Sequence, residues 1–228
     1  MRKFDYSFLD NGLLPANLVN LTANIAELKT MAGIRKEQYR QIFTELEAVA
    51  KVQSVKSSNA IEGIVTSDER IAAIVNQNSS PLNHNEAEIA GYRDVLAIIH
   101  ENFDTIPITQ NYILQLHKIL YGHMNNPIAG RTKTVQNYIS ATYPDGRVET
   151  LFIPLAPFET PEALDKICEE YNRVIGNMEL EPLIVIPVFI HDFLCIHPFN
   201  DGNSRMSRLL TTLLLYRNGF YVGKYISL

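Results

Sequence analysis

The chain has 228 residues, of which 46% are hydrophobic and 20% charged, and its formal net charge is −5. This length suits one domain with a sizeable core, and the composition excludes an extended disordered chain. The acidic balance argues against a protein whose main task is to coat nucleic acid, because phosphate binding requires a basic face.

Targeting and redox signals are weak. The start, MRKFDYSFLDNGLLP, lacks the apolar core of a signal peptide, and no segment approaches the roughly 20 apolar residues that span a bilayer. We therefore expect a cytoplasmic protein with no membrane partner. Cys168 and Cys195 are too few for a disulfide framework or a zinc site, so we expect two buried, reduced thiols.

Helical periodicity dominates the first half of the chain. Apolar residues recur at three- and four-residue spacing on one helix face, namely Ile42, Phe43, Leu46, Val49 and Val52. TSDE then predicts a capping box, with Thr66 as N-cap and Glu69 three residues on. Further helices are predicted from Asn85, over NEAEIAGYRDVLAIIHENF, and after Thr109, the N-cap of TQNYILQLHKILYG.

The pattern changes to short β-prone runs between Val135 and Leu151. Asp145-Gly146 is the dipeptide that a tight turn favours, so we expect a β-hairpin flap at about residues 135–157. A helix follows, with Thr160 as its N-cap, Pro161 at its first position and Gly176 beyond its end.

The domain organisation is predicted to be simple. No internal repeat or Gly/Ser-rich linker divides the chain. We expect one all-α body with a small β-hairpin, in which an N-terminal helical region, residues 1–80, packs on a core of residues 81–228.

Two apolar helices flank a polar loop near the end of the chain. EPLIVIPVFIHDFLCI is apolar nearly all round, which predicts a central buried helix with a bend or a late start at Pro187. A second helix, about Asn203 to Asn218, is predicted to bury Leu209, Leu210, Leu213 and Leu214. The stretch between and into them, HPFNDGNSRMSR (197–208), has more ionisable groups than a turn needs. We therefore predict that it holds a charged ligand.

The residue types in this loop suit a polyphosphate. Gly202 and Asn203 fall just before a helix, whose first N–H groups and partial positive charge bind anions. Arg205 and Arg208 are three apart on that helix, and each offers a fork of donors that matches phosphate oxygens.

An acid and a histidine complete the loop. Asp201 would repel the phosphates unless a divalent cation lay between them, so it predicts Mg²⁺. His197 is suited to take a proton from an incoming hydroxyl, which is worth roughly two to four orders of magnitude in rate. His191 is expected to be a hydrogen-bonded core residue, and no role is assigned to the histidines without metal-like spacing, namely His84, His100, His117 and His123.

The loop closely resembles the signature of the Fic (Fido) family, HxFx(D/E)GNGRxxR, whose members transfer AMP from ATP to a Ser, Thr or Tyr hydroxyl of a target protein. It departs where Ser204 replaces the usual second Gly. The resemblance implies the mainly helical Fic fold, with His197 as general base and Asp201 as the Mg²⁺ ligand. It places the nucleotide phosphates at Gly202, Asn203, Ser204, Arg205 and Arg208.

Two other segments resemble the same family. GRTKTVQNYI (130–139) and FIPLAPFETPEAL look like the region of the target-docking flap, which implies that the hairpin edge holds a target by strand addition, near Phe152, Ile153 and Pro154. Many relatives continue past GFYVGKYISL. The resemblance thus leaves open whether the chain is truncated after Leu228. A truncation would remove part of an adenine pocket or a DNA-binding extension, and only such an extension would imply a nucleic-acid partner.

The earlier segment SSNAIEGI resembles the family's inhibitory motif (S/T)xxxE(G/N), with Ser58, Glu62 and Gly63 in the matching places. Its position implies the class whose inhibitory helix precedes the core. A Glu62 carboxylate that reached Arg208 would occupy the place of the ATP γ-phosphate.

With this resemblance, the sequence predicts a protein adenylyltransferase that uses Mg-ATP, modifies a target protein or itself, and is autoinhibited by Glu62. Hydrolytic removal of AMP stays open as the reverse reaction. A nucleotide-sensing module stays open too, favoured if Ser204 spoils the phosphate loop. So does a metal-dependent phosphohydrolase with His197 and Asp201 as ligands, although such sites usually need more His and Asp nearby.

Overall fold

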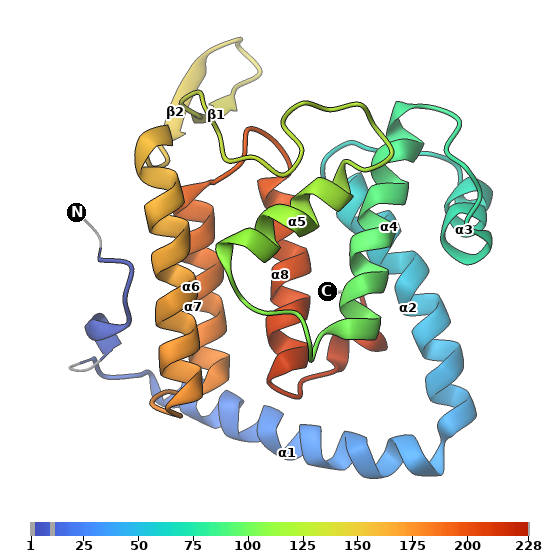
Figure 1. Cartoon of the computed structure of the whole chain (residues 1–228). Coiled ribbons are helices and arrows are strands. Elements are labelled where there is room, and N and C mark those ends of the chain that lie inside the picture. Colours follow the sequence, from blue (N-terminus) through green and yellow to red (C-terminus); the bar gives the residue numbers. More distant parts are fainter. Residues whose placement is uncertain (1–2, 10–11, 228) are drawn as a thin grey trace.

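The computed structural model describes residues 3–9 and 12–227 (Figure 1). As predicted, the chain is mainly helical with one small hairpin. The α-helices are α1 (Ala16–Gln38), α2 (Arg40–Ala60), α3 (Asp68–Gln77), α4 (His84–Asn102), α5 (Gln110–Leu120), α6 (Thr160–Gly176), α7 (Pro182–Ile196) and α8 (Asn203–Arg217). The strands are β1 (Ile139–Thr142) and β2 (Val148–Phe152). Among the described helices, none combines the length and the apolar character needed to cross a bilayer.

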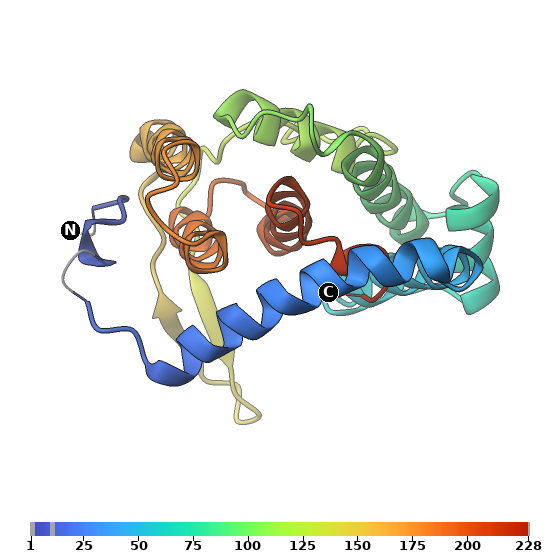
Figure 2. The same cartoon turned by 90° about the horizontal axis from the view of Figure 1, so that it is seen from below.

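Helix α8 lies at the centre of the bundle, with the other helices around it (Figure 2). It packs against α7, α4 and α2. The four leucines predicted to face the core, Leu209, Leu210, Leu213 and Leu214, are all buried. The N-terminal end of α8 lies beside the end of α7, and the polar loop that joins the two helices lies at this end of the bundle (Figure 1).

A close approach of α4 and α5 forms one wall beside this loop. The two helices can pack so tightly because Gly91 has no side chain: a Cβ there would lie 1.9 Å from the carbonyl oxygen of Leu120. Tyr121 follows directly at the end of α5 and is buried. The glycine thus fixes where Tyr121 meets the loop.

Of the three N-caps predicted from the sequence, one agrees with the structure and two differ. Thr109 is the N-cap of α5, as predicted, and accepts a hydrogen bond from the Tyr112 N–H. The N-cap of α3 is Ser67 and not Thr66, whose hydroxyl donates to Glu86. Thr160 does not cap α6: it lies inside the helix and donates to the carbonyl of Ala156.

The hairpin forms where the β-prone runs predicted it. β1 and β2 pair antiparallel, and Gly146 in the turn has a φ of +83°, which explains the Asp-Gly dipeptide. Every residue of both strands is exposed except Ala141, which is partly buried. The hairpin therefore projects from the helical body (Figure 1).

Burial corrects several expectations. The helix through Ile42 and Val49 exists, but these side chains are 55% and 60% exposed. His191 is not a core residue, since it lies on the outer face of α7 with its side chain 60% exposed. Cys168 is buried as expected, whereas Cys195 is only partly buried. Pro187 lies inside α7, which already starts at Pro182.

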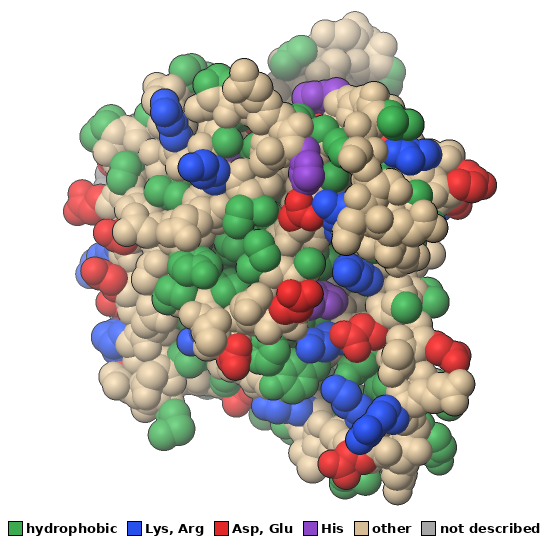
Figure 3. Space-filling model, turned by 45° about the vertical axis from the view of Figure 1, so that its right-hand side comes forward, with side chains coloured by type: hydrophobic (Ala, Val, Ile, Leu, Met, Phe, Trp, Pro, Cys, Tyr) green, Lys and Arg blue, Asp and Glu red, His purple; other side chains and the backbone are tan. Residues whose placement is uncertain are grey.

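Acidic and basic side chains are interspersed on the face shown in Figure 3, with histidines among them. That face has no large basic patch, in keeping with the net charge of −5.

Candidate active site

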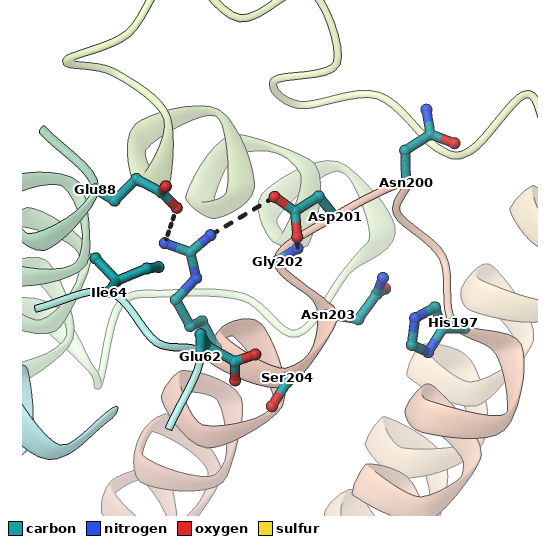
Figure 4. A pocket seen from close by; sticks show the side chains of 10 residues that line it. Glu62, Ile64, Glu88, His197, Asn200, Asp201, Gly202, Asn203 and Ser204 are labelled. Atoms are coloured by element: carbon teal, nitrogen blue, oxygen red, sulfur yellow. Dashed lines mark hydrogen bonds and ion pairs between the residues drawn. The ribbon is translucent and has the colours of Figure 1, made fainter. Parts of the chain in front are cut away.

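The α7–α8 loop and the end of α2 enclose a cavity of about 350 Å³ (Figure 4). Glu88 comes from α4, and the other lining residues come from the turn after α2 and from the loop and start of α8. The lining residues are Glu62, Ile64, Glu88, His197, Asn200, Asp201, Gly202, Asn203, Ser204 and Arg205. The fold therefore brings the predicted loop and the predicted inhibitory glutamate together in one place.

Hydrogen bonds inside the loop fix its shape. The Asn203 amide donates to the Phe199 carbonyl at 2.7 Å and accepts from the Phe199 N–H at 2.9 Å. The Phe199 ring is buried and stacks on His117, with 3.7 Å between ring centroids. Both ends of the Asn203 amide are used, so in this structure the side chain holds the loop.

The turn into α8 is suited to an anion. Gly202 is the N-cap and has a φ of +79°, which glycine adopts without strain. Gly202 has no side chain with which to cap the helix, and its own N–H donates to Asp201 Oδ1 at 2.7 Å. The N–H groups that follow in the first turn of α8 form, together with the helix dipole, an anion-binding geometry.

Asp201 and Arg205 are linked through Tyr121. The Tyr121 hydroxyl donates to Asp201 Oδ2 at 2.7 Å and accepts from Arg205 Nη2 at 3.0 Å. Arg205 is buried, and its Nη1 lies 2.6 Å from Glu88 Oε2. The carboxylate offsets the cost of burying the guanidinium. Asp201 itself is 65% exposed, so it stays accessible to a ligand.

Arg208 connects the loop to the end of α2. Its Nε donates to Ser58 Oγ at 2.7 Å, and its Nη2 donates to the Ser58 carbonyl at 2.8 Å and to Glu62 Oε1 at 2.9 Å. Its Nη1 donates to Ser204 Oγ at 2.7 Å. The contact between Glu62 and Arg208 that the motif suggested is present. Gly63, the third motif residue, has a φ of +76° and turns the chain away from α2.

Two titratable groups of the cavity have shifted pKa values. Burial of the imidazole lowers the pKa of His197, and the Lys133 ammonium group adds to the effect. His197 is therefore neutral at neutral pH. Burial alone would raise the pKa of Glu62, but hydrogen bonds from Ser204 and Arg208 outweigh it, and the pKa is lowered.

His117 supports the loop from α5, although the sequence gave no reason to assign it a role. Its Nδ1 accepts from the Gly130 N–H at 3.0 Å, so its Nε2 carries the proton and donates to the Asp201 carbonyl at 3.1 Å. Burial lowers the pKa of His117 to about 4. The ring is therefore a neutral structural bridge.

The predicted docking residues lie beside the cavity and do not line it. Phe152 and Ile153 are 41% and 59% exposed, whereas Pro154 is buried. The Leu155 N–H donates to the Cys195 carbonyl, two residues before His197. The base of the hairpin is thus anchored next to the loop.

The cavity has few ligands for a metal ion. Among the described residues, no group of three or more His, Cys, Asp or Glu could hold one. Asp201, an accessible carboxylate beside the anion-binding turn, fits a cation that is shared with phosphate oxygens.

Comparison with known proteins agrees with this geometry. Residues 107–215 match the model of the Fic/DOC family. Protein adenylyltransferase Fic of Nematostella vectensis is 29% identical over 181 residues, which cover 75% of this chain and 39% of that protein. Protein adenylyltransferase fic-1 of Caenorhabditis elegans is 30% identical over 124 residues, which cover 54% and 22%.

The same fold occurs in a solved structure. A Fic family protein from Desulfovibrio desulfuricans superposes with a TM-score of 0.72, at 22% identity, over 94% of this chain and 61% of that one. The matches cover less than half of the length of either curated relative. Residues 107–215 of this chain therefore match the Fic/DOC family, and the fold around them is the fold of the Fic family protein.

Proposed function

We propose that this chain is a protein adenylyltransferase, which transfers AMP from Mg-ATP to a Ser, Thr or Tyr hydroxyl of a target protein. The observation that carries the proposal is the cavity in which a neutral His197, an accessible Asp201 and the uncapped N-terminus of α8 meet. The names of the two curated relatives support this reaction class. In the proposal, residues 81–228 form the catalytic core and residues 1–80 carry the regulatory motif.

The nucleotide phosphates would bind at the start of α8. The first turn of α8, from Asn203, offers backbone N–H groups, and Arg205 supplies positive charge from a fixed position between Glu88 and Tyr121. Asp201 would hold Mg²⁺, whose charge would offset that of the phosphates when bound. Ser204 is accommodated, because its hydroxyl accepts from Arg208 and no strained backbone is required of it.

His197 would act as the general base. Its neutral imidazole accepts the proton of the target hydroxyl while the hydroxyl oxygen attacks the α-phosphorus. The bond between the α-phosphorus and the oxygen that bridges to the β-phosphate breaks, and pyrophosphate leaves. The target retains AMP as a phosphodiester, and the proton remains on His197 until solvent takes it.

Glu62 would inhibit this reaction. Ser58, Ser204 and Glu62 take four of the five N–H donors of Arg208, and Glu62 holds the side of the guanidinium that a γ-phosphate would need. A triphosphate would then bind out of line, and a misplacement of about 1 Å can cost roughly a hundredfold in rate. Removing Glu62 would free one side of the guanidinium for the phosphate.

The target would dock on the hairpin. β1 and β2 form a sheet of two strands with both outer edges free among the described residues, and such an edge can add a strand from another chain. Phe152 and Ile153, both exposed, would contact its side chains. The hydroxyl to be modified would thereby reach the cavity from the side of His197.

The test compares ATP labelled at the α- or γ-phosphate, with wild type, Glu62→Gly and Glu62→Gly with His197→Ala, in lysate of the source cell. We expect α-label on protein, including the chain itself, to rise well above wild type in Glu62→Gly. Loss of His197 should lower it by roughly 10²- to 10⁴-fold while ADP affinity stays within a few-fold.

Other outcomes would point elsewhere. Transfer of the γ-label would indicate a kinase, and nucleotide binding without any transfer would indicate a sensor. Free phosphate released without protein labelling would indicate a phosphohydrolase. Equal α-labelling by wild type and Glu62→Gly, at matched ATP and Mg²⁺, would contradict inhibition by Glu62.

A further inference from the structure

Lys133 is a buried cation on the segment between α5 and β1. The residue is only 2% exposed, and no Asp or Glu of the described chain forms an ion pair with it. Burial lowers the pKa of its ammonium group to about 8, so the group is charged at neutral pH. A buried charge without a carboxylate is unfavourable unless fixed dipoles offset the cost.

The hydrogen-bond partners of Lys133 lie on both sides of His197. Its Nζ donates to the carbonyl of Ile196 at 2.9 Å, and its backbone N–H donates to the carbonyl of Pro198 at 2.7 Å. Ile196 is the last residue of α7, whose terminal carbonyl groups carry the negative end of the helix dipole. The partial negative charge at this end of the helix stabilises the ammonium group.

His197 depends on such support because its backbone is left-handed, with a φ of 51°, which is uncommon for a residue with a Cβ. Asn137 adds a further bond from the same segment, from its Nδ2 to the carbonyl of Phe199 at 3.1 Å. The segment from Lys133 to Asn137 thus holds the carbonyl groups on either side of the histidine.

We propose that Lys133 is a positioning residue for His197: its ammonium group, bonded to the Ile196 carbonyl, holds the left-handed turn in place and fixes a positive charge beside the imidazole. That His197 accepts the proton of a target rests on the function proposed above. The effect of Lys133 on the imidazole does not depend on that function.

Other charged groups also face the imidazole across the cavity, namely Glu62, Glu88, Asp201 and Arg205. The carboxylates favour the protonated ring and the guanidinium opposes it. Burial is the largest cause that lowers the pKa of His197, Lys133 is the next, and the Leu194 carbonyl acts in the opposite direction. Loss of the Lys133 charge alone should therefore raise the pKa of His197.

An NMR titration of the His197 ring tests this, with the signal assigned by its loss in His197→Gln. In Lys133→Met the pKa of His197 should rise by about half a unit to one unit. Lys133→Arg, which keeps the charge and a donor, should leave it near the wild-type value. Arg131→Met removes an exposed cation from the same segment and is the matched control.

An unchanged His197 pKa in a folded Lys133→Met protein overturns the proposal. If circular dichroism shows that this variant does not fold, Lys133→Gln, which keeps a donor without the charge, is titrated under the same criterion. A rise in Arg131→Met as large as in Lys133→Met also overturns it, because the effect would then be a general loss of positive charge.

The pH profile of AMP transfer gives a second readout. In Lys133→Met the acid limb should move to higher pH by the same amount as the ring pKa, and Lys133→Arg should restore it, with ADP affinity within a few-fold throughout. If Lys133→Met lowers the melting temperature but does not shift the acid limb of the pH profile, Lys133 has only a structural role and the proposal is wrong. A wild-type chain without transfer activity would contradict the proposed function. The NMR titration would then decide whether Lys133 acts on His197.

Discussion

The side chains around the cavity differ in their role: some line the cavity, and others form hydrogen bonds that fix the lining residues in place. Tyr121 holds two neighbours at once, because its hydroxyl joins Asp201 to Arg205 and its ring lies 5.5 Å from the guanidinium carbon. A hydroxyl that both donates and accepts polarises the groups on either side. Its removal therefore affects a carboxylate and a buried cation together.

Tyr121→Phe should lower the free energy of unfolding by about 1–3 kcal/mol, because Arg205 loses an acceptor in a buried place. It should also weaken the binding of ADP in the presence of Mg²⁺, since the Asp201 carboxylate loses one of its two hydrogen bonds and keeps only the one from the Gly202 N–H. Urea denaturation and calorimetry measure the two effects. Tyr138→Phe removes a hydroxyl from a side chain that is 62% exposed, and it should change neither quantity. Equal values for the two variants would contradict the network.

Gly202→Ala should be more destabilising than Gly146→Ala. Both glycines have a similar positive φ, +79° and +83°, so the backbone strain of about 1–2 kcal/mol is shared. A Cβ at Gly202 would lie 3.0 Å from the Tyr121 hydroxyl, whereas at Gly146 nothing lies within 4 Å. Thermal denaturation measures the difference, and phosphate or ADP binding should fall in Gly202→Ala only. Equal losses of stability in the two variants would show that backbone strain alone, and not the contact with Tyr121, destabilises Gly202→Ala.

Most of the residues that line the cavity could be predicted from the sequence, whereas the residues that hold them could not. His197 and Asp201 stand out because ionisable groups in a short turn need a chemical reason. Tyr121 and Lys133 lie 80 and 63 positions away from the loop atoms that they contact. Nothing local distinguishes a tyrosine at a helix end from any other core aromatic, so only the fold reveals the contact.

At the scale of elements, helix starts are decided by competition for short polar side chains. Thr66 and Ser67 could both have capped α3, and local pattern favoured Thr66. Glu86, at the start of α4, is almost completely buried and takes the Thr66 hydroxyl as a donor, which leaves Ser67 to cap the helix. The positions of α2 to α8 and of the hairpin could therefore be predicted from the sequence pattern, but the N-cap of α3 could not.

The α3–α4 junction should lose stability in acid. Hydrogen bonds from Arg70, then from the Leu82 N–H and Thr66, lower the pKa of Glu86 to about 2 from an ordinary value of 4.5. A lowered pKa in the folded state stabilises above pH 4.5, and this contribution is lost as the pH falls towards 2. Urea denaturation between pH 7 and 2 should show a steeper acid loss in wild type than in Glu86→Gln. Parallel curves would contradict the assignment.

At the scale of the whole molecule, the helices differ in how firmly they are held. Helix α1 spans 23 residues, and none is buried. Its contacts with the core include Lys29, which donates to the Asn218 carbonyl at 2.8 Å and lies over the Phe220 ring. Sequence periodicity did not single out α1, and for α2 it predicted a helix but not what the helix packs on, because an apolar stripe has the same spacing whether or not another element covers it. Ile42 and Val49 on α2 show this, because they belong to the predicted apolar stripe and are nevertheless exposed.

The projecting hairpin divides the cavity's residues between two lengths of chain. Glu62, Ile64 and Glu88 precede its tip, whereas the other lining residues, from His197 to Arg205, follow it. Contacts of α4 with α8, and of α5 with α6, join the two lengths without passing through the hairpin. A break at the tip would leave these contacts intact.

Brief treatment with trypsin should therefore cut after Arg147, which is exposed in the hairpin turn, and give fragments 1–147 and 148–228 that stay associated. Size-exclusion chromatography followed by denaturing electrophoresis would detect both fragments in one peak, and Arg147→Gln should resist this cut. Fragments that separate would contradict the packing. If they stay together and still bind ADP, the cavity is a non-covalent assembly of two half-sites, and the two halves, expressed as separate chains, should restore it by complementation.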